Sequence, residues 1–132
     1  MSKDGSENPW RQVMETRPHH DLEIWRLGIR LVGHVYRVTD NFPDRERFHL
    51  QDQLRRAATG VPSNIAEGSA RDSDREFARY LYMARGSLEE IDTQLELAGE
   101  LGYLDDLALD ELAVTFENLS RGLDGLIKKL RA

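Results

Sequence analysis

The chain has 132 residues, of which 39% are hydrophobic and 32% are charged, which fits one folded domain and excludes a collagen-like or mainly disordered polypeptide. The absence of cysteine excludes disulfide scaffolds, thiolate metal sites and cysteine nucleophiles. With 18 Lys and Arg against 24 Asp and Glu the net charge is −6, so binding to nucleic acid or to an anionic membrane would need a local basic patch. The sequence has neither a run of about 18 apolar residues nor a secretory signal, so we expect a cytoplasmic protein.

Residues 1–20 mix Gly, Ser, Asn and Pro with scattered charges, which predicts a mobile tail before a domain over residues 21–132. Residues 22–40 predict the first helix, because they carry two rows of apolar residues at helical spacing. One row consists of Ile24, Leu27, Leu31, Val35 and Val38. The other row consists of Leu22, Trp25, Ile29, Val32 and Tyr36.

The second of these rows is the candidate for an interface between copies of the chain. Soluble monomers rarely leave an apolar stripe of this length open to water. We therefore expect the row to pack on another subunit of a homo-oligomer. The residues at this candidate interface are Trp25, Ile29, Val32 and Tyr36. The alternative is that loops or the N-terminal tail cover the row within one chain.

The second predicted helix covers residues 44–70, where apolar residues recur at intervals of three and four. Pro62 is expected to kink this helix, and Gly68 is expected to help end it. Ser73 and Glu76 then have the spacing of a capping box. This signal marks the start of a third helix.

The third and fourth helices carry the clearest periodicity in the chain. A heptad seam over residues 77–98 is followed by Gly102, which predicts the end of the third helix. A second seam over residues 112–130 predicts the fourth helix, with Asp105 or Asp106 as its N-cap. Because short links make neighbouring helices antiparallel, the whole pattern predicts an all-α, up-down-up-down four-helix bundle.

Histidines and acidic residues offer few candidates for chemistry. We expect the adjacent His19 and His20 to be solvated or to cap a helix, and His34 to lie at the edge of the core. Phosphate-loop, zinc-protease and serine-hydrolase motifs are absent from the sequence. Because no histidine follows His49, the carboxylates of residues 89–100 predict a solvated acidic face rather than a di-iron centre. We therefore predict no catalytic residue, no metal site and no cofactor.

Arginines are concentrated in and around the second predicted helix. The candidate contacts for nucleic acid or for a protein partner are Arg45, Arg47, Arg55, Arg56 and Arg71. A basic strip of this kind would bind phosphates with an affinity that falls steeply as salt is added. The alternative, which we favour, is that these arginines pair with the acidic third helix of another subunit.

Small and polar residues interrupt the apolar rows of the second and third helices. The candidate structural motif consists of Asn64, Glu67, Gly68, Arg85, Gly86 and Ser87. A glycine in mid-helix costs about 1 kcal/mol relative to alanine, so we expect Gly86 and Ser87 to form a close contact with the second helix. We also expect Arg85 or Arg56 to bond the Asn or the Glu of this motif.

Several blocks of the sequence resemble one bacterial family. The blocks are Phe42-Pro43, Leu50-x-x-Gln53-Leu54-Arg55-Arg56-Ala57, Val61-Pro62-Ser63-Asn64-Ile65-Ala66-Glu67-Gly68, Tyr80-Leu81-Tyr82-Met83-Ala84-Arg85-Gly86-Ser87-Leu88-Glu89-Glu90 and Gln94-Leu95-Glu96-Leu97-Ala98. Over about residues 21–131 the chain resembles the four-helix bundle family that includes proteins encoded in intervening sequences of 23S ribosomal RNA. This family is similar in fold to the accessory variability determinant of diversity-generating retroelements. That determinant forms a basic pentamer that works with a reverse transcriptase and nucleic acid.

The resemblance implies an assembly of five bundles but no established activity. Intervening-sequence proteins have no established biochemical role, and the retroelement determinant depends on a positive charge that this chain, at −6, does not have. We therefore predict a non-enzymatic oligomeric scaffold or interaction protein that does not bind a membrane. Its expected partners are copies of itself and a further protein. The alternative is a nucleic-acid-binding accessory factor for RNA or DNA, acting with a reverse transcriptase or an rRNA-related partner.

Overall fold

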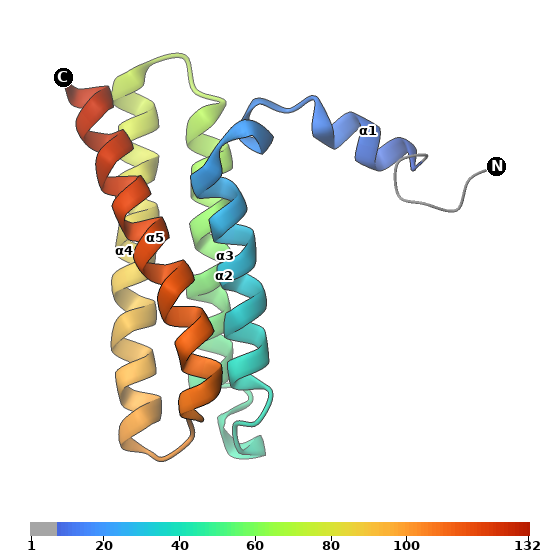
Figure 1. The fold of residues 1–132 in the computed structure, drawn as a ribbon, viewed down its shortest axis with the longest axis vertical. Coiled ribbons are helices and arrows are strands. Elements are labelled where there is room, and N and C mark those ends of the chain that lie inside the picture. The colour runs from blue at the N-terminus through green and yellow to red at the C-terminus, as the bar shows by residue number, and fades with distance from the viewer. Residues whose placement is uncertain (1–7) are drawn as a thin grey trace.

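The computed structural model describes residues 8–132, apart from the side chains of Met14, Glu15 and Asp21. This part of the chain is all-helical, and its four long helices pack side by side with alternating direction (Figure 1). The long helices are α2 (Glu23–Thr39), α3 (Leu50–Ser69), α4 (Asp74–Glu100) and α5 (Asp106–Arg131). The shorter elements are α1 (Pro9–Glu15) and the 3-10 turns η2 (Pro18–Asp21) and η3 (Asp44–Glu46). The predicted four-helix bundle is therefore confirmed for one chain.

Capping residues fix three helix ends where the sequence predicts them. Ser73 Oγ accepts a hydrogen bond from the Glu76 amide at 3.2 Å, and Asp105 Oδ1 accepts one at 2.9 Å from the amide two residues on. Gly102 follows the end of α4 with φ at +77°, a conformation that other residues rarely adopt. Only the Ser73 half of the capping box is formed. The Glu76 carboxylate, which would complete the box by bonding back to the cap, instead accepts a hydrogen bond from Arg79.

The second predicted helix differs from its prediction at its start. It starts at Leu50 rather than at residue 44, since residues 44–46 form the separate turn η3. Pro62 lies inside α3 without dividing it. The helix ends at Ser69, one residue after Gly68 and within one residue of the predicted end. A Cβ at Gly68 would lie 2.7 Å from the Cβ of Tyr80, so this glycine allows α3 to approach α4 closely.

The core lies between the four helices and is built from the predicted seams. The fully buried Leu and Ile side chains are Leu31, Leu54, Ile65, Leu81, Leu88, Ile91, Leu119 and Leu123. Each side chain of this size contributes about 1.5–3 kcal/mol when it is removed from water. Burial of both heptad seams therefore accounts for the packing of α4 and α5 into the bundle.

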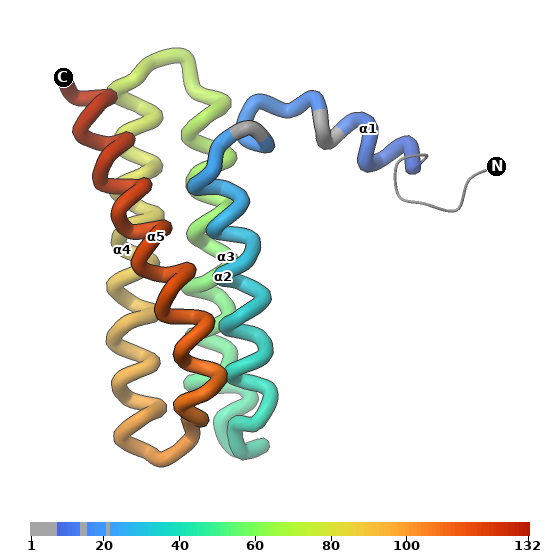
Figure 2. Tube along the Cα trace, viewed as in Figure 1, coloured from blue at the N-terminus to red at the C-terminus, as the bar shows by residue number. Residues whose placement is uncertain are grey.

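Part of the predicted mobile tail is helical. Residues 9–15 form α1, which extends away from the bundle near the start of α2 (Figure 2). Trp10, the one aromatic residue of this segment, is 68% exposed. Residues 1–7 of the predicted tail lie outside the described residues.

Candidate functional site

The second apolar row of α2 faces outward from the bundle. The first row is buried in the core, as the residues at 24, 27, 31, 35 and 38 show. In the second row Ile29 is 48% exposed and Tyr36 is 40% exposed, whereas Trp25 and Val32 are half-buried. One chain therefore leaves this row partly open to water.

The turn η2 covers one end of the outer row. The ring of His20 stacks on Trp25 with 4.2 Å between centroids, and the ring of His19 meets Trp25 edge-on at 4.9 Å. Burial, followed by the nearby charges of His20 and Arg17, lowers the pKa of His19. Both histidines thus pack on an aromatic ring, a contact that the sequence did not predict, and both remain partly exposed to water. N-terminal residues therefore cover Trp25, as the alternative to an interface predicts for the whole row.

Arg55 covers the other end of the row. Its guanidinium lies 4.3 Å from the centroid of the Tyr36 ring. Its Nε donates to Thr39 Oγ1 at 2.9 Å, and its Nη2 donates to Asp40 Oδ1 at 2.9 Å. These contacts fasten the C-terminal end of α2 to α3. Ile29, between the two covered ends, remains the most exposed member of the outer row.

The structure brings three of the five candidate arginines together. Arg47, Arg55 and Arg56 line one groove of about 300 Å³. Arg45 donates to the hydroxyl of the tyrosine that follows α4, at 3.3 Å. Arg71 donates to the hydroxyl of a tyrosine on α4. The candidates at 45 and 71 therefore lie outside the groove that the other three share.

Carboxylates of the same chain hold two of the three arginines in this groove. Besides the pair formed by Arg55, Arg56 Nε donates to Asp52 Oδ2 at 2.9 Å. Arg47 lies 5.5 Å from the ring centroid of Phe48 and, within residues 8–132, has no ion pair. Phe48 is 79% exposed beside these arginines. This basic and aromatic groove was missed in the sequence, because Phe48 belongs to neither apolar row.

The predicted close contact at Gly86 is wrong. A Cβ at Gly86 would meet no atom within 4 Å, so the missing side chain serves no close approach there. The approach occurs at Gly60 on α3, where a Cβ would lie 3.2 Å from Ser87 Oγ. Ser87 therefore lies beside the second helix, and the glycine opposite it is Gly60 rather than Gly86.

The predicted hydrogen bonds of the motif also differ. Asn64 Nδ2 donates to the carbonyl oxygen of Gly60 at 2.9 Å, and a carboxylate oxygen of Glu67 lies 4.0 Å from an Arg71 nitrogen. Arg85 instead crosses from α4 to α5, where its Nη1 donates to Asp124 at 3.2 Å. The helix orientation, which the sequence pattern left open, directs Arg85 away from α3. Arg56 is likewise bonded to Asp52, so neither expected arginine reaches the motif.

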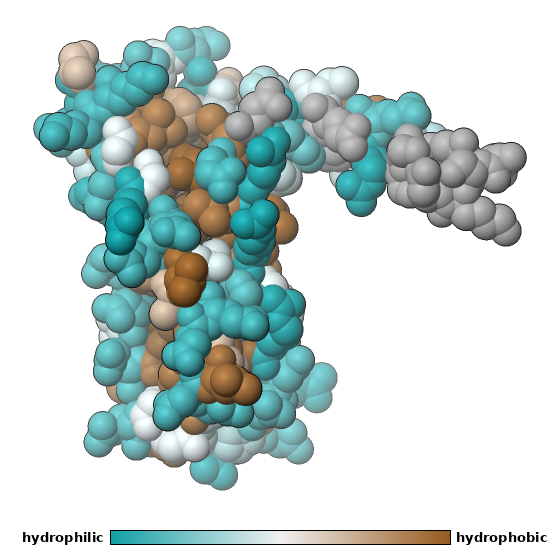
Figure 3. All heavy atoms as spheres, in the orientation of Figure 1, coloured by the Kyte–Doolittle hydropathy of each residue, from teal (hydrophilic) through white to brown (hydrophobic). Residues whose placement is uncertain are grey.

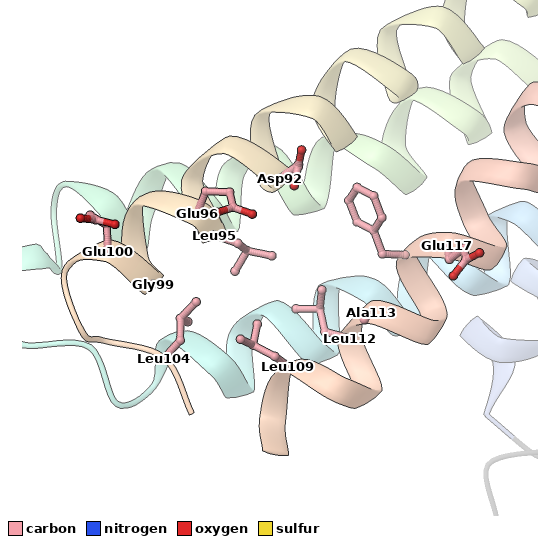
Figure 4. Close-up of a pocket in the computed structure, with 11 residues that line it drawn as sticks. Asp92, Leu95, Glu96, Gly99, Glu100, Leu104, Leu109, Leu112, Ala113 and Glu117 are labelled. Atoms are coloured by element: carbon pink, nitrogen blue, oxygen red, sulfur yellow. The ribbon is translucent and has the colours of Figure 1, made fainter. Parts of the chain in front are cut away.

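The seam between α4 and α5 opens into a groove of about 600 Å³ near the loop that joins them (Figure 4). The large apolar residues that line it are Leu95, Leu104, Leu109, Leu112 and Phe116. The carboxylates that line it are Asp92, Glu96, Glu100 and Glu117. Leucines from both sides point into the space between the helices (Figure 4). Part of the predicted acidic face of the third helix therefore borders an apolar groove, which the sequence did not indicate.

Within residues 8–132, no helix is long and apolar enough to cross a membrane. In the same part of the chain, no group of three or more His, Asp or Glu side chains is placed to hold a metal ion. The fold defines a helical-bundle protein with an apolar helix face, a basic and aromatic groove and an acidic-rimmed groove on its surface.

The model of the 23S rRNA-intervening sequence protein family matches residues 20–125, and the chain belongs to this family. The predicted family is thereby confirmed. No curated protein matches the chain.

Proposed function

We propose that the chain is a non-enzymatic cytoplasmic scaffold protein that assembles into a homopentamer through the outer row of α2. The observation that supports this most is Ile29, which is 48% exposed in the middle of a helix whose other apolar row is buried. Packing this face on a second subunit would stabilise the assembly by about 25 cal/mol for each Å² of apolar surface removed from water. The resemblance to a pentameric retroelement protein is the basis for the number five.

Charge supports a contact between two different surfaces. Exposed arginines flank the outer row of α2 at Arg26, Arg30 and Arg37. The exposed face of α4 carries carboxylates over residues 89–100. An interface that joins α2 of one copy to α4 of the next would pair an arginine rim with an acidic face. Contacts of this head-to-tail kind generate closed rings when the rotation between copies fits.

The test is the mass of the protein in solution before and after a charge is placed in the outer row. We expect Ile29→Glu to dissociate the assembly, because a buried carboxylate without a partner is costly at an apolar interface. Val114→Glu is a matched control, since Val114 is 63% exposed on α5 and lies outside both the outer row of α2 and the exposed face of α4. Both variants should keep the helical circular dichroism of the wild type.

The pattern of dissociation decides the proposal. Loss of the assembly in Ile29→Glu with retention in Val114→Glu supports the α2 interface. Retention in both variants, or a wild-type protein that is already monomeric, contradicts it. Dissociation by Val114→Glu alone would place the interface on α5 without the outer row of α2 and would also contradict it.

A second candidate function is the binding of single-stranded nucleic acid, which the groove around Phe48 favours. Phe48 is 79% exposed, and exposed aromatic rings beside arginines are the surfaces on which unpaired bases stack. Arg47 and Arg56 would supply contacts to phosphates. Arg55 is assigned to structure rather than binding, since it fastens α2 to α3.

Titration of labelled single-stranded RNA at low and high salt tests this candidate. Stacking of one base contributes about 1–3 kcal/mol, so Phe48→Ala should weaken binding by roughly tenfold. The control is Arg121→Gln, because Arg121 is an exposed arginine on α5 with a carboxylate four residues away. Binding that is absent at low salt, or equally weakened by the control, would refute the candidate.

A further inference from the structure

The helix α1 forms an arm that leaves the bundle. It extends sideways from the end of the bundle at which α2 begins, and it does not run along another helix (Figures 1 and 2). Trp10 and Val13 lie three residues apart, on one side of α1, and are 68% and 52% exposed. A seven-residue helix is marginal in water without packing. The arm therefore presents an apolar side that a single chain leaves uncovered.

The groove between α4 and α5 is an apolar site large enough to hold the apolar side of α1. Its volume of about 600 Å³ falls in the range of about 300–1,000 Å³ in which protein pockets enclose a ligand. Leu95, Leu109 and Phe116 line it and are only half-buried. Apolar surface (brown) also interrupts the polar covering around α5 in Figure 3. The groove is therefore a second uncovered apolar surface, separate from the outer row of α2.

The charges of the arm and the groove are complementary. Residues 8–17 contain Arg11 and Arg17 against one acidic residue, so this segment has a net charge of +1. Four carboxylates line the groove. Glu117 is paired with Arg121 at 2.6 Å, whereas the other three form no ion pair within the described residues. The groove thus offers unpaired negative charge around an apolar floor, which suits a segment with apolar and basic side chains.

The arm cannot reach the groove of its own chain. Stacking of His20 on Trp25 holds η2 at the start of α2, and two residues link η2 to α1. Along α3 the chain returns to the same end of the bundle, where α4 begins at Asp74 (Figure 1). Asp92, the nearest groove residue on α4, lies 18 residues further, or about 27 Å along the helix at about 1.5 Å per residue. A two-residue link of about 7 Å and a helix of about 10 Å do not cover this distance.

We propose that α1 of one copy docks in the acidic-rimmed groove between α4 and α5 of a neighbouring copy. The proposal rests on the self-association proposed above and names a second contact in that assembly. Because α1 and the groove are different surfaces, the contact between two copies is head-to-tail, and contacts of this kind are compatible with a closed ring. The arm lies outside residues 20–125, the part that matches the family, so the contact is a feature of this chain beyond the family match.

Disulfide cross-linking tests the proposal cleanly, because the natural chain has no cysteine. In the full chain we combine Val13→Cys on the arm with Ala113→Cys, an exposed residue that lines the groove. Mild oxidation should join the chains into dimers and higher multimers on a non-reducing gel. The matched control combines Val13→Cys with Met83→Cys, which is exposed on α4 and does not line the groove.

Every outcome of the cross-linking is decisive for the arm. Covalent multimers that form with Ala113→Cys and not with Met83→Cys support the exchange. A disulfide within one chain, the absence of cross-links, or equal cross-linking in the control would overturn it. Light scattering on the same samples separates the two proposals, since an intact oligomer without arm cross-links leaves self-association standing while the arm contact fails.

A change of charge at the rim tests the electrostatic part. In the cross-linking variant, Glu96→Arg should slow multimer formation by up to about fivefold, because an ion pair at a surface contributes up to about 1 kcal/mol. Glu67→Arg is the control, since Glu67 is exposed on α3, outside both this groove and the acidic face of α4. Equal rates in the two variants would contradict a contact between the basic arm and this rim.

Discussion

The close approach of α3 to α4 at Gly68 gives the sharpest prediction about packing. A Cβ at Gly68 would lie 2.7 Å from Tyr80 Cβ and 3.0 Å from Phe77 Cδ1. Because Tyr80 Cβ is attached directly to the backbone of α4, rotation of a side chain cannot relieve the contact. We therefore expect Gly68→Ala to push the two helices apart and to destabilise the bundle.

The magnitude follows from comparison with a second glycine in a helix. Overpacking of this kind costs about 1–3 kcal/mol, whereas replacing a helical glycine by alanine gains up to about 1 kcal/mol. At Gly86 a Cβ meets nothing within 4 Å, so Gly86→Ala should show the gain alone. Both variants gain a similar amount of stability from replacing a helical glycine by alanine, so this gain cancels when the two variants are compared. Gly68→Ala should therefore be less stable than Gly86→Ala by about 1–3 kcal/mol.

Urea unfolding at one fixed protein concentration measures this difference, since the stability of an oligomer depends on concentration. Gly86→Ala should unfold at a higher urea concentration than the wild type, and Gly68→Ala at a lower one than Gly86→Ala. Equal stability of the two variants would refute the reasoning from the Cβ distances. Destabilisation by Gly86→Ala would restore the contact that the sequence predicted at that position.

Three further predictions concern single side chains. Ser73→Ala should lower the free energy of unfolding by about 1 kcal/mol in urea titrations, because α4 loses its N-cap. Arg55→Gln should lower the free energy of unfolding by about 1–3 kcal/mol, since Thr39 loses its hydrogen-bond donor. Arg56→Gln should change it by less than about 0.5 kcal/mol, because the ion pair of Arg56 is exposed. Equal effects of the two variants would contradict a structural role for Arg55. Burial lowers the pKa of His34 below its usual value of 6.5, so the unfolded chain binds a proton more readily than the folded chain. Stability should therefore fall as the pH drops through 6.5 toward the pKa of the folded state. His34→Gln should reduce this acid sensitivity, and an unchanged dependence of stability on pH would exclude the effect.

The long helices could be predicted from the sequence because their signals are local. The seam of α4 repeats every seven residues, and its start is marked by Ser73, whose hydroxyl can reach only the first amides of a helix. The two rows of α2 likewise separate into a buried and an outward row, as their spacing requires. The helix α1 was not predicted, because seven residues are too few to show a period.

The candidate surfaces depend on contacts between helices and were predicted less well. Gly86 and Gly60 are both glycines inside a helix, but only Gly60 faces a neighbouring side chain. The rotation of each helix about its axis decides which glycine faces a neighbour, and the sequence motif does not specify this rotation. The same holds for Arg85, which meets Asp124 on α5 rather than the motif on α3. The apolar groove between α4 and α5 arises from a seam that packs less closely than the other adjacent helix pairs.

Self-association through α2 is the central claim, and the absolute mass in solution tests it most directly. Light scattering on a sizing column, over a range of protein concentrations, gives this mass without a shape assumption. The proposed pentamer would have a mass of about 76 kDa, which is five times the 15.2 kDa of one chain. A mass near 15.2 kDa at every concentration would contradict it.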